Sequence, residues 1–161
     1  MRLLAALSIA LVLGSVPAQA RPHHYHHHVA VQPVAAPSFW SSFSSGGSGL
    51  VSSAKTHLGA TAAQLGLPGS LWCADFVNDV LRHNGYRGTG SRMAKSFLAN
   101  PQTTAHVGAI AVMGRRGGGH VGIVSGFDAA GNPTIVSGNH NHRVREATYP
   151  RGRIIAYVNP R

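Results

Sequence analysis

Residues 71–85, LWCADFVNDVLRHNG, contain Cys73, the single cysteine of the chain. Apolar residues recur in this stretch at helical spacing, which predicts a helix with one buried face, and Cys73 shares that face. The turn before it, with Ser70 as a candidate cap, predicts where the helix begins, and Gly85 predicts where it ends. We therefore expect Cys73 in the first turn of a helix.

A thiol in that position has favourable electrostatics for reaction. The free N–H groups and the positive dipole end of a helix favour the thiolate and lower a pKa that is ~8.5 in a free cysteine. This setting indicates a nucleophile, and the alternative is a small buried hydrophobe, the usual role of a lone cysteine. One cysteine excludes an internal disulfide. If the protein is exported, as the next observation indicates, its unpaired thiol would serve either catalysis or an intermolecular disulfide.

The first 20 residues have the pattern of a secretory signal peptide. One arginine precedes a short apolar run, and Ala18-Gln19-Ala20 ends it with the small side chains that signal peptidase accepts. The run is too short to span a membrane, and no later stretch is long and apolar enough to do so. We expect cleavage after Ala20 and a protein exported to the periplasm or the extracellular space, with no membrane insertion afterwards.

Residues 21–48 have the composition of a tail. They are rich in histidine at 23–28 and in serine and glycine at 41–48, which predicts disorder. The histidines could converge on a Zn, Ni or Cu ion, or they could simply be solvated. Residues 49–161 are long enough for one domain with one modest core, and we expect a monomer.

The charge of the chain is strongly positive. The sequence has 14 Lys and Arg against 4 Asp and Glu, a formal charge of +10 with histidines neutral. Nucleic acid, anionic lipid and acidic wall polymer would all be attracted. Export and the lack of aromatic residues among the scattered arginines argue against nucleic acid.

The pattern of the domain changes from helical to extended along the chain. Helices are expected at 50–58, 71–85 and 91–98, and short β-type runs at 109–113, 120–127, 133–137 and 153–158. A polar turn at 128–132 joins the middle two runs into a hairpin. This order predicts an α+β fold in which N-terminal helices pack on a small antiparallel sheet.

His120 opens its strand directly after three glycines. The imidazole shares a strand face with Gly122, so glycines without side chains lie on both sides of it. We therefore expect a ligand or another segment of the chain to approach the strand closely here. A histidine can take a proton from a thiol and pass it to a leaving amine, because its unperturbed pKa is ~6.5. A polar side chain from residues 137–142, for which we choose Asn139, could hold the far ring nitrogen.

These segments together resemble the CHAP-type cysteine amidohydrolases/peptidases, which share the papain-like fold with NlpC-type cell-wall peptidases. The resemblance runs from about residue 50 to 160 and rests on Trp72-Cys73-Ala74-Asp75-Phe76-Val77, Gly88-Thr89-Gly90-Ser91, Gly119-His120-Val121-Gly122-Ile123-Val124 and Gly138-Asn139. It implies a peptidoglycan hydrolase that acts on wall peptides or muropeptides without a cofactor. It also implies that Cys73 is the nucleophile, His120 the base and Asn139 the orienting residue.

At some positions the resemblance does not settle the role of the residue. Many members of the family have a glutamate two residues before the asparagine, where this chain has Ser137. Trp72 and the loop residues Arg115 and Arg116 are candidates for substrate binding, with a solvated surface loop as the alternative for the arginines.

Two other classes of protein remain as alternatives. A metal-binding protein could use Cys73, His120, His140 and His142 as tetrahedral ligands. A non-catalytic wall-binding module could keep the fold and the charge, but it would not need both Cys73 and His120. For the hydrolase, the bond cleaved would be a peptide cross-link or the amide that joins peptide to sugar.

Overall fold

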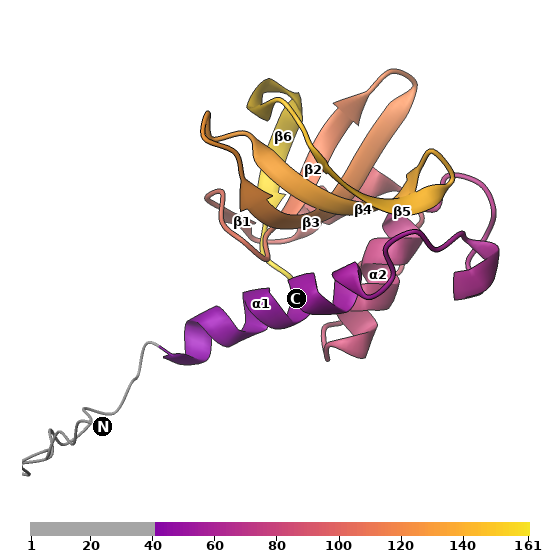
Figure 1. The fold of residues 1–161 in the computed structure, drawn as a ribbon, viewed down its shortest axis with the longest axis horizontal. Helices are drawn as coiled ribbons and strands as arrows, with labels where there is room; N and C mark the ends of the chain where they lie inside the picture. The colour runs from indigo at the N-terminus through magenta and orange to yellow at the C-terminus, as the bar shows by residue number, and fades with distance from the viewer. Residues whose placement is uncertain (1–40) are drawn as a thin grey trace, which may run out of the picture. The chain divides into compact units, whose positions relative to one another are not determined.

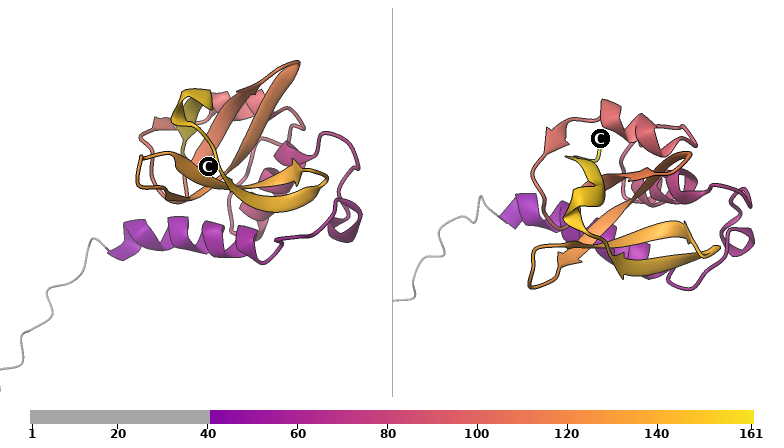
Figure 2. Two further views of the ribbon diagram at one scale, coloured as in Figure 1. Left: turned by 45° about the horizontal axis from the view of Figure 1, so that its top comes forward. Right: turned by 90° about the horizontal axis from the view of Figure 1, so that it is seen from above.

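The computed structural model describes residues 41–161, with side chains from Gly47 onward. The predicted signal peptide and residues 21–40 of the predicted tail lie outside the described residues. Two α-helices, α1 (Ser41–Lys55) and α2 (Cys73–His83), precede a six-stranded sheet. Figures 1 and 2 show both helices on the same side of the sheet, and α2 packs on β3 and β4. The α+β expectation is therefore confirmed.

The sheet is antiparallel throughout, in the order β1-β6-β2-β3-β4-β5. Its strands are β1 (Gln102–Thr103), β2 (Ile110–Arg115), β3 (Gly118–Phe127), β4 (Pro133–His140), β5 (Arg143–Thr148) and β6 (Ile154–Val158). Short 3-10 helices occur at η1 (Ala63–Leu65), η2 (Ala94–Ala99) and η3 (Arg151–Arg153). The predicted hairpin turn after β3 is present, because Asp128 accepts hydrogen bonds from the backbone of Ala130 and Asn132.

The central strands of the sheet are buried on both faces. On β2, Ile110 and Val112 belong to the core between sheet and helices, while Ala111 and Met113 belong to a second cluster on the opposite face. Successive side chains of a strand point to opposite faces, so a nearly unbroken apolar run such as this one indicates a strand covered on both sides. The second cluster includes Tyr149, which becomes important for the site.

Some element boundaries differ from those expected. Helix α1 begins at Ser41 rather than at residue 50 and ends at Lys55 rather than at 58, so the predicted disordered tail does not extend to residue 48. A Cβ atom added at Gly47 would lie 2.7 Å from the carbonyl oxygen of Val107, so the glycine allows the helix to approach that loop closely. Tertiary packing of this kind overrides the Ser/Gly composition.

Two strands were missed, and one predicted helix has another form. β5 carries three charged residues and a single fully buried side chain, Val144, because it is an edge strand. β1 has only two residues and lies at the other edge. The helix expected at 91–98 is instead the 3-10 helix η2, which begins at Ala94.

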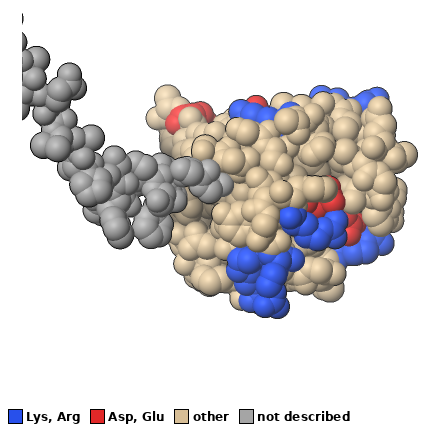
Figure 3. Space-filling view, turned by 90° about the horizontal axis from the view of Figure 1, so that it is seen from below, with Lys and Arg blue, Asp and Glu red and all other residues tan. Residues whose placement is uncertain are grey.

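Among the charged residues in the range 41–161, Lys and Arg outnumber Asp and Glu. On the face shown in Figure 3, Lys and Arg side chains cover more area than Asp and Glu. No helix in the described range 41–161 has the length and the apolar character needed to cross a membrane.

Candidate active site

Cys73 is the first residue of α2, as the sequence predicted. Trp72 occupies the N-cap position instead of Ser70, and no side chain caps the helix. The backbone N–H groups of the first turn therefore receive no hydrogen bond from the side chain of the N-cap residue. The thiol itself is only 6% exposed and lies against β3, where it interacts with the backbone of Val121. The strand residue that follows His120 is thus in contact with Cys73.

His120 is buried within the sheet, with 5% of its surface exposed. A hydrogen bond of 3.0 Å joins its Nε2 atom to Oγ of Ser137, which is fully buried on β4. The other ring nitrogen, Nδ1, is buried without a hydrogen-bond partner. One nitrogen is therefore held by the protein, and the second is left unpaired.

The close approach predicted at Gly122 comes from β4. A Cβ atom at Gly122 would lie 2.8 Å from Cβ of Ser137 and 2.6 Å from the carbonyl oxygen of Val136. Any side chain at position 122 would push β4 away, since real Cβ atoms do not come this close to other heavy atoms. Gly122 thus allows Ser137 to reach the imidazole of His120.

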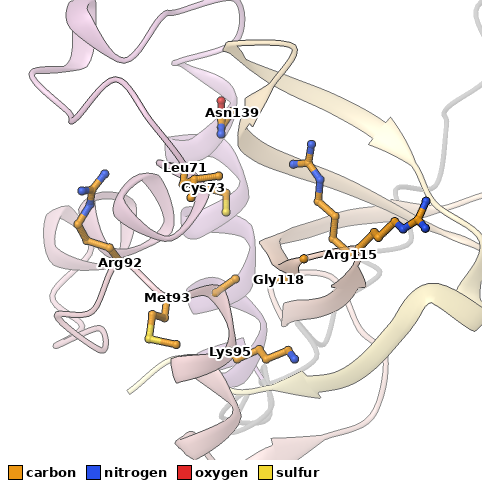
Figure 4. A pocket seen from close by; sticks show the side chains of 12 residues that line it. Leu71, Cys73, Arg92, Met93, Lys95, Arg115, Gly118 and Asn139 are labelled. Carbon is orange, nitrogen blue, oxygen red and sulfur yellow. The ribbon is translucent and has the colours of Figure 1, made fainter.

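Asn139 does not hold the imidazole, contrary to our expectation. The register between β4 and β5 shifts between Ser137 and His140, and the backbone of Asn139 has a left-handed φ of 56°. A bulge of this kind re-aims a side chain. Asn139 instead lines the same hollow as Cys73 (Figure 4), and the bond to His120 comes from Ser137.

The thiol pKa also differs from the expected direction. Burial raises the pKa of Cys73 above its ordinary value, and hydrogen bonding to the backbone of Val121, Ala74 and Cys73 itself only partly offsets this effect. The helix N-terminus does favour the thiolate, but the loss of solvation is the larger effect here. We therefore correct the expectation of a lowered thiol pKa in the free protein.

The imidazole is held in its neutral form. Burial, followed by the positive charges of Arg115, His140 and Arg153, lowers the pKa of His120 to about 4. Desolvation penalises the charged ring, and nearby cations add to that penalty. Cys73 and His120 are therefore both neutral near pH 7 in the free protein, rather than a thiolate–imidazolium pair.

This burial predicts a loss of stability in acid. Below about pH 6.5 the unfolded chain binds a proton at His120 that the native protein does not, so stability is lost as the pH falls from 6.5 to about 4. Each unit of pKa difference corresponds to about 1.4 kcal/mol, so the full loss should be about 3 kcal/mol. Urea unfolding at pH 7, 5.5 and 4 should show a shallower dependence for His120→Gln than for the wild type. An equal dependence of the free energy of unfolding on pH in the two proteins would contradict this prediction.

The hollow beside Cys73 has a volume of about 370 Å³. Figure 4 shows Arg92 and Met93 on one side of the cysteine and Arg115 on the other. Arg116 and the three glycines before His120 also line it. At Gly119 an added Cβ would lie 3.3 Å from Cβ of Ala94, so this glycine lets η2 pack against the strand.

Trp72 does not contribute to this hollow. Its side chain is 1% exposed and packs against Gly138, where an added Cβ would lie 2.7 Å from the indole ring. Trp72, a candidate for substrate binding, therefore offers almost no surface to a ligand in this hollow. The residue next to it, Leu71, is 73% exposed and lines the hollow in a left-handed conformation, with φ of 50°.

Two side chains fix the loops around the cysteine helix. Asn78 of α2 is buried, and its side chain bonds the backbone of Thr89 and Ser91. Arg92 pairs with Asp75 at 3.0 Å and also donates to the carbonyl of Ser70. The Gly88–Ser91 loop and the turn before α2 are thereby tied to the helix that carries Cys73.

The alternative metal site is not assembled in the described part of the chain. No group of three or more His, Cys, Asp or Glu side chains there is placed to hold a metal ion. Nδ1 of His140 bonds the hydroxyl of Tyr149 at 3.1 Å, and His142 lines a different hollow from that of Cys73. The four candidate ligands therefore do not converge.

A buried thiol at the N-terminus of a helix, packed on the strand that carries a buried imidazole, is the set of groups found in thiol hydrolases. Residues 65–139 match the family model of the CHAP domain, so this segment of the chain is similar to CHAP domains. CHAP domains are cysteine amidohydrolase/peptidase domains of cell-wall hydrolases. The match includes Cys73, His120, Ser137 and Asn139. Searches of curated proteins and of solved structures found no match to the chain.

Sequence reasoning missed Ser137 as the partner of His120. The available signal was its position two residues before Asn139, where many CHAP-type proteins have a glutamate. It missed Tyr149 as well, because nothing in its local sequence separates a site residue from an ordinary core tyrosine.

Proposed function

We propose that this protein is a peptidoglycan hydrolase that cleaves an amide bond by thiol catalysis, with Cys73 as nucleophile and His120 as base. The observation that carries this proposal is the buried Nδ1 atom of His120, which has no hydrogen-bond partner. The other ring nitrogen, Nε2, is held by Ser137, and the next residue on the strand, Val121, contacts Cys73. The order of elements along the chain is the one expected of a papain-like fold: first the helix with the cysteine, then the strand with the histidine, then the strand with its polar partner. That order supports the same assignment.

The reaction would proceed by acyl transfer. Nδ1 of His120 takes the proton from Cys73, and the sulfur attacks the carbonyl carbon of the amide. The resulting oxyanion accepts hydrogen bonds from N–H groups at the uncapped start of α2, including that of Cys73. His120 then gives the proton to the leaving amine, and water hydrolyses the thioester and restores the thiol.

Ser137 would act as a positioning residue. If Nε2–H of His120 donates to Oγ of Ser137, the ring is fixed in the tautomer whose Nδ1 can accept a proton. Asn139 lines the hollows beside both Cys73 and His120, so we assign it to substrate contact.

Ser137→Ala should lower kcat by about 10- to 100-fold with little change in KM, because the imidazole loses its fixed tautomer and orientation. Ring nitrogen chemical shifts of His120 should change from one tautomer to a mixture. Ser125→Ala is the matched control, since Ser125 bonds Thr134 and Glu146 and does not contact His120. An unchanged tautomer with full activity in Ser137→Ala would exclude the positioning role.

Mass spectrometry of a purified peptidoglycan digest tests the function directly. New amine and carboxyl ends in matched amounts are expected with the wild type and not with Cys73→Ser. The masses of the fragments identify the bond: loss of the whole peptide from sugar defines an amidase, and cut cross-links or stems define an endopeptidase. Absence of any new ends over a range of peptidoglycan types would refute the hydrolase proposal.

A further inference from the structure

A second hollow lies next to His120 and is basic. Its volume is about 230 Å³, and it is lined by Arg115, His120, Asn139, His140, Asn141, Tyr149 and Arg153. Arg115 and Asn139 also line the hollow beside Cys73, so the two spaces meet at these side chains. The two spaces are therefore neighbours, and we call the second one the basic hollow.

The two arginines of the basic hollow have no acidic partner in residues 41–161. The whole sequence has only four acidic residues, and all four are described. Each is engaged elsewhere: Asp75 with Arg92, Asp79 with Arg82, Glu146 with Lys55, and Asp128 in the hairpin turn. Within residues 41–161, Arg115 and Arg153 therefore form no ion pair with an acidic side chain, so an anionic ligand could bind both of them.

Tyr149 organises the walls of the basic hollow. Its hydroxyl bonds Nδ1 of His140 at 3.1 Å, and its ring lies 5.4 Å from the guanidinium carbon of Arg153. The rings of His120 and His140 lie 6.2 and 6.1 Å from that of Tyr149. Tyr149 is 8% exposed and belongs to the second core cluster, so the arrangement is anchored rather than free on the surface.

We propose that the basic hollow binds a free carboxylate of the substrate peptide, held by Arg115 and Arg153 with His140 at its side. This inference rests on the proposed hydrolase function. A guanidinium binds carboxylate with paired, charge-assisted hydrogen bonds, and the planar fork gives orientation as well as energy. The carboxylate would fix which amide of a wall peptide lies over Cys73. His140, Tyr149 and Arg153 lie beyond the segment that matches the CHAP family.

Binding of a carboxylate there would also change His120. The charges of Arg115, His140 and Arg153 contribute to lowering the pKa of His120, after the effect of burial. An anion among them cancels part of this positive field, so the pKa of His120 should rise when substrate binds. His120 would become a stronger base at the moment when Cys73 must lose its proton.

The test uses matched peptides that differ only in one carboxyl group, free in one and amidated in the other. One pair varies the C-terminal carboxylate and a second pair varies a side-chain carboxylate, so the preferred pair identifies the source. In the wild type, kcat/KM should be at least about tenfold higher for the free acid of one pair, which corresponds to about 1.4 kcal/mol. Arg153→Gln should bring this ratio close to one, whereas Arg151→Gln, an exposed arginine outside the hollow, should leave it unchanged.

Binding to Cys73→Ser separates this proposal from the hydrolase proposal. The free acid should bind this variant at least about tenfold more tightly than the amide, and the pKa of His120 should rise in an NMR titration of its ring. Equal binding of acid and amide in both pairs would overturn the carboxylate site, even if the wild type hydrolyses both. Preferential binding of the acid without hydrolysis of peptidoglycan by the wild type would keep the site and refute the hydrolase.

Discussion

Replacement of Cys73 by serine should lower kcat on peptidoglycan fragments by about a thousandfold or more, with the protein still folded. A hydroxyl is scarcely ionised near neutral pH, and the buried site gives it no help beyond the neutral imidazole of His120. Serine is close to cysteine in size, so the packing of α2 on β3 should survive. Product release measured by mass spectrometry, with circular dichroism as the folding control, checks this result.

His120→Ala provides the partner experiment. Nucleophile and base act as a unit, so the single variants and the double variant should have nearly the same residual rate. A double variant that is far slower than either single variant would mean that the two residues act independently. Loss of activity on adding a chelator, with recovery on adding zinc, would instead favour a metal site.

Iodoacetamide gives an independent view of the thiol. Because burial raises the pKa of Cys73 and the ring of His120 is neutral, alkylation of the free protein should accelerate steadily above neutral pH. A plateau of rapid alkylation at about pH 5 to 7 would show a thiolate–imidazolium pair already present at rest and would contradict the neutral pair.

Trp72→Ala should produce the largest loss of stability among single substitutions near the site. The indole is 1% exposed and fills the space between α2 and Gly138, so its removal should cost about 3 to 5 kcal/mol. That is a large part of the roughly 5 to 15 kcal/mol that stabilises a typical domain. Urea unfolding at pH 7 measures the change in the free energy of unfolding.

Leu71→Ala is the matched control for Trp72→Ala. Leu71 is adjacent in the chain but 73% exposed, so the free energy of unfolding should change by no more than about 0.5 kcal/mol. If Trp72→Ala unfolded at the wild-type urea concentration and only raised KM, the indole would be a substrate contact after all.

The sequence by itself determined the elements whose signals are local. The apolar spacing in residues 71–85 predicted α2 and put Cys73 at its start, and the left-handed Gly85, with φ of 81°, follows its end. The turn at 128–132 and the extended runs before and after it predicted the central hairpin. Gly122 indicated a close approach beside His120, although it could not say that β4 makes it.

The tertiary structure alone decided the details of the site. At the bulge between Ser137 and His140, Ser137 rather than Asn139 is the hydrogen-bond partner of the imidazole, although both residues are polar and close in sequence. The preference of a segment for helix, strand or turn depends on neighbouring residues. A bulge, a buried indole and the solvation of a thiol depend instead on which distant segments pack together. For that reason the sequence predicted Cys73 and His120 as a pair, and packing decided their pKa values, their third partner and the basic hollow beside them.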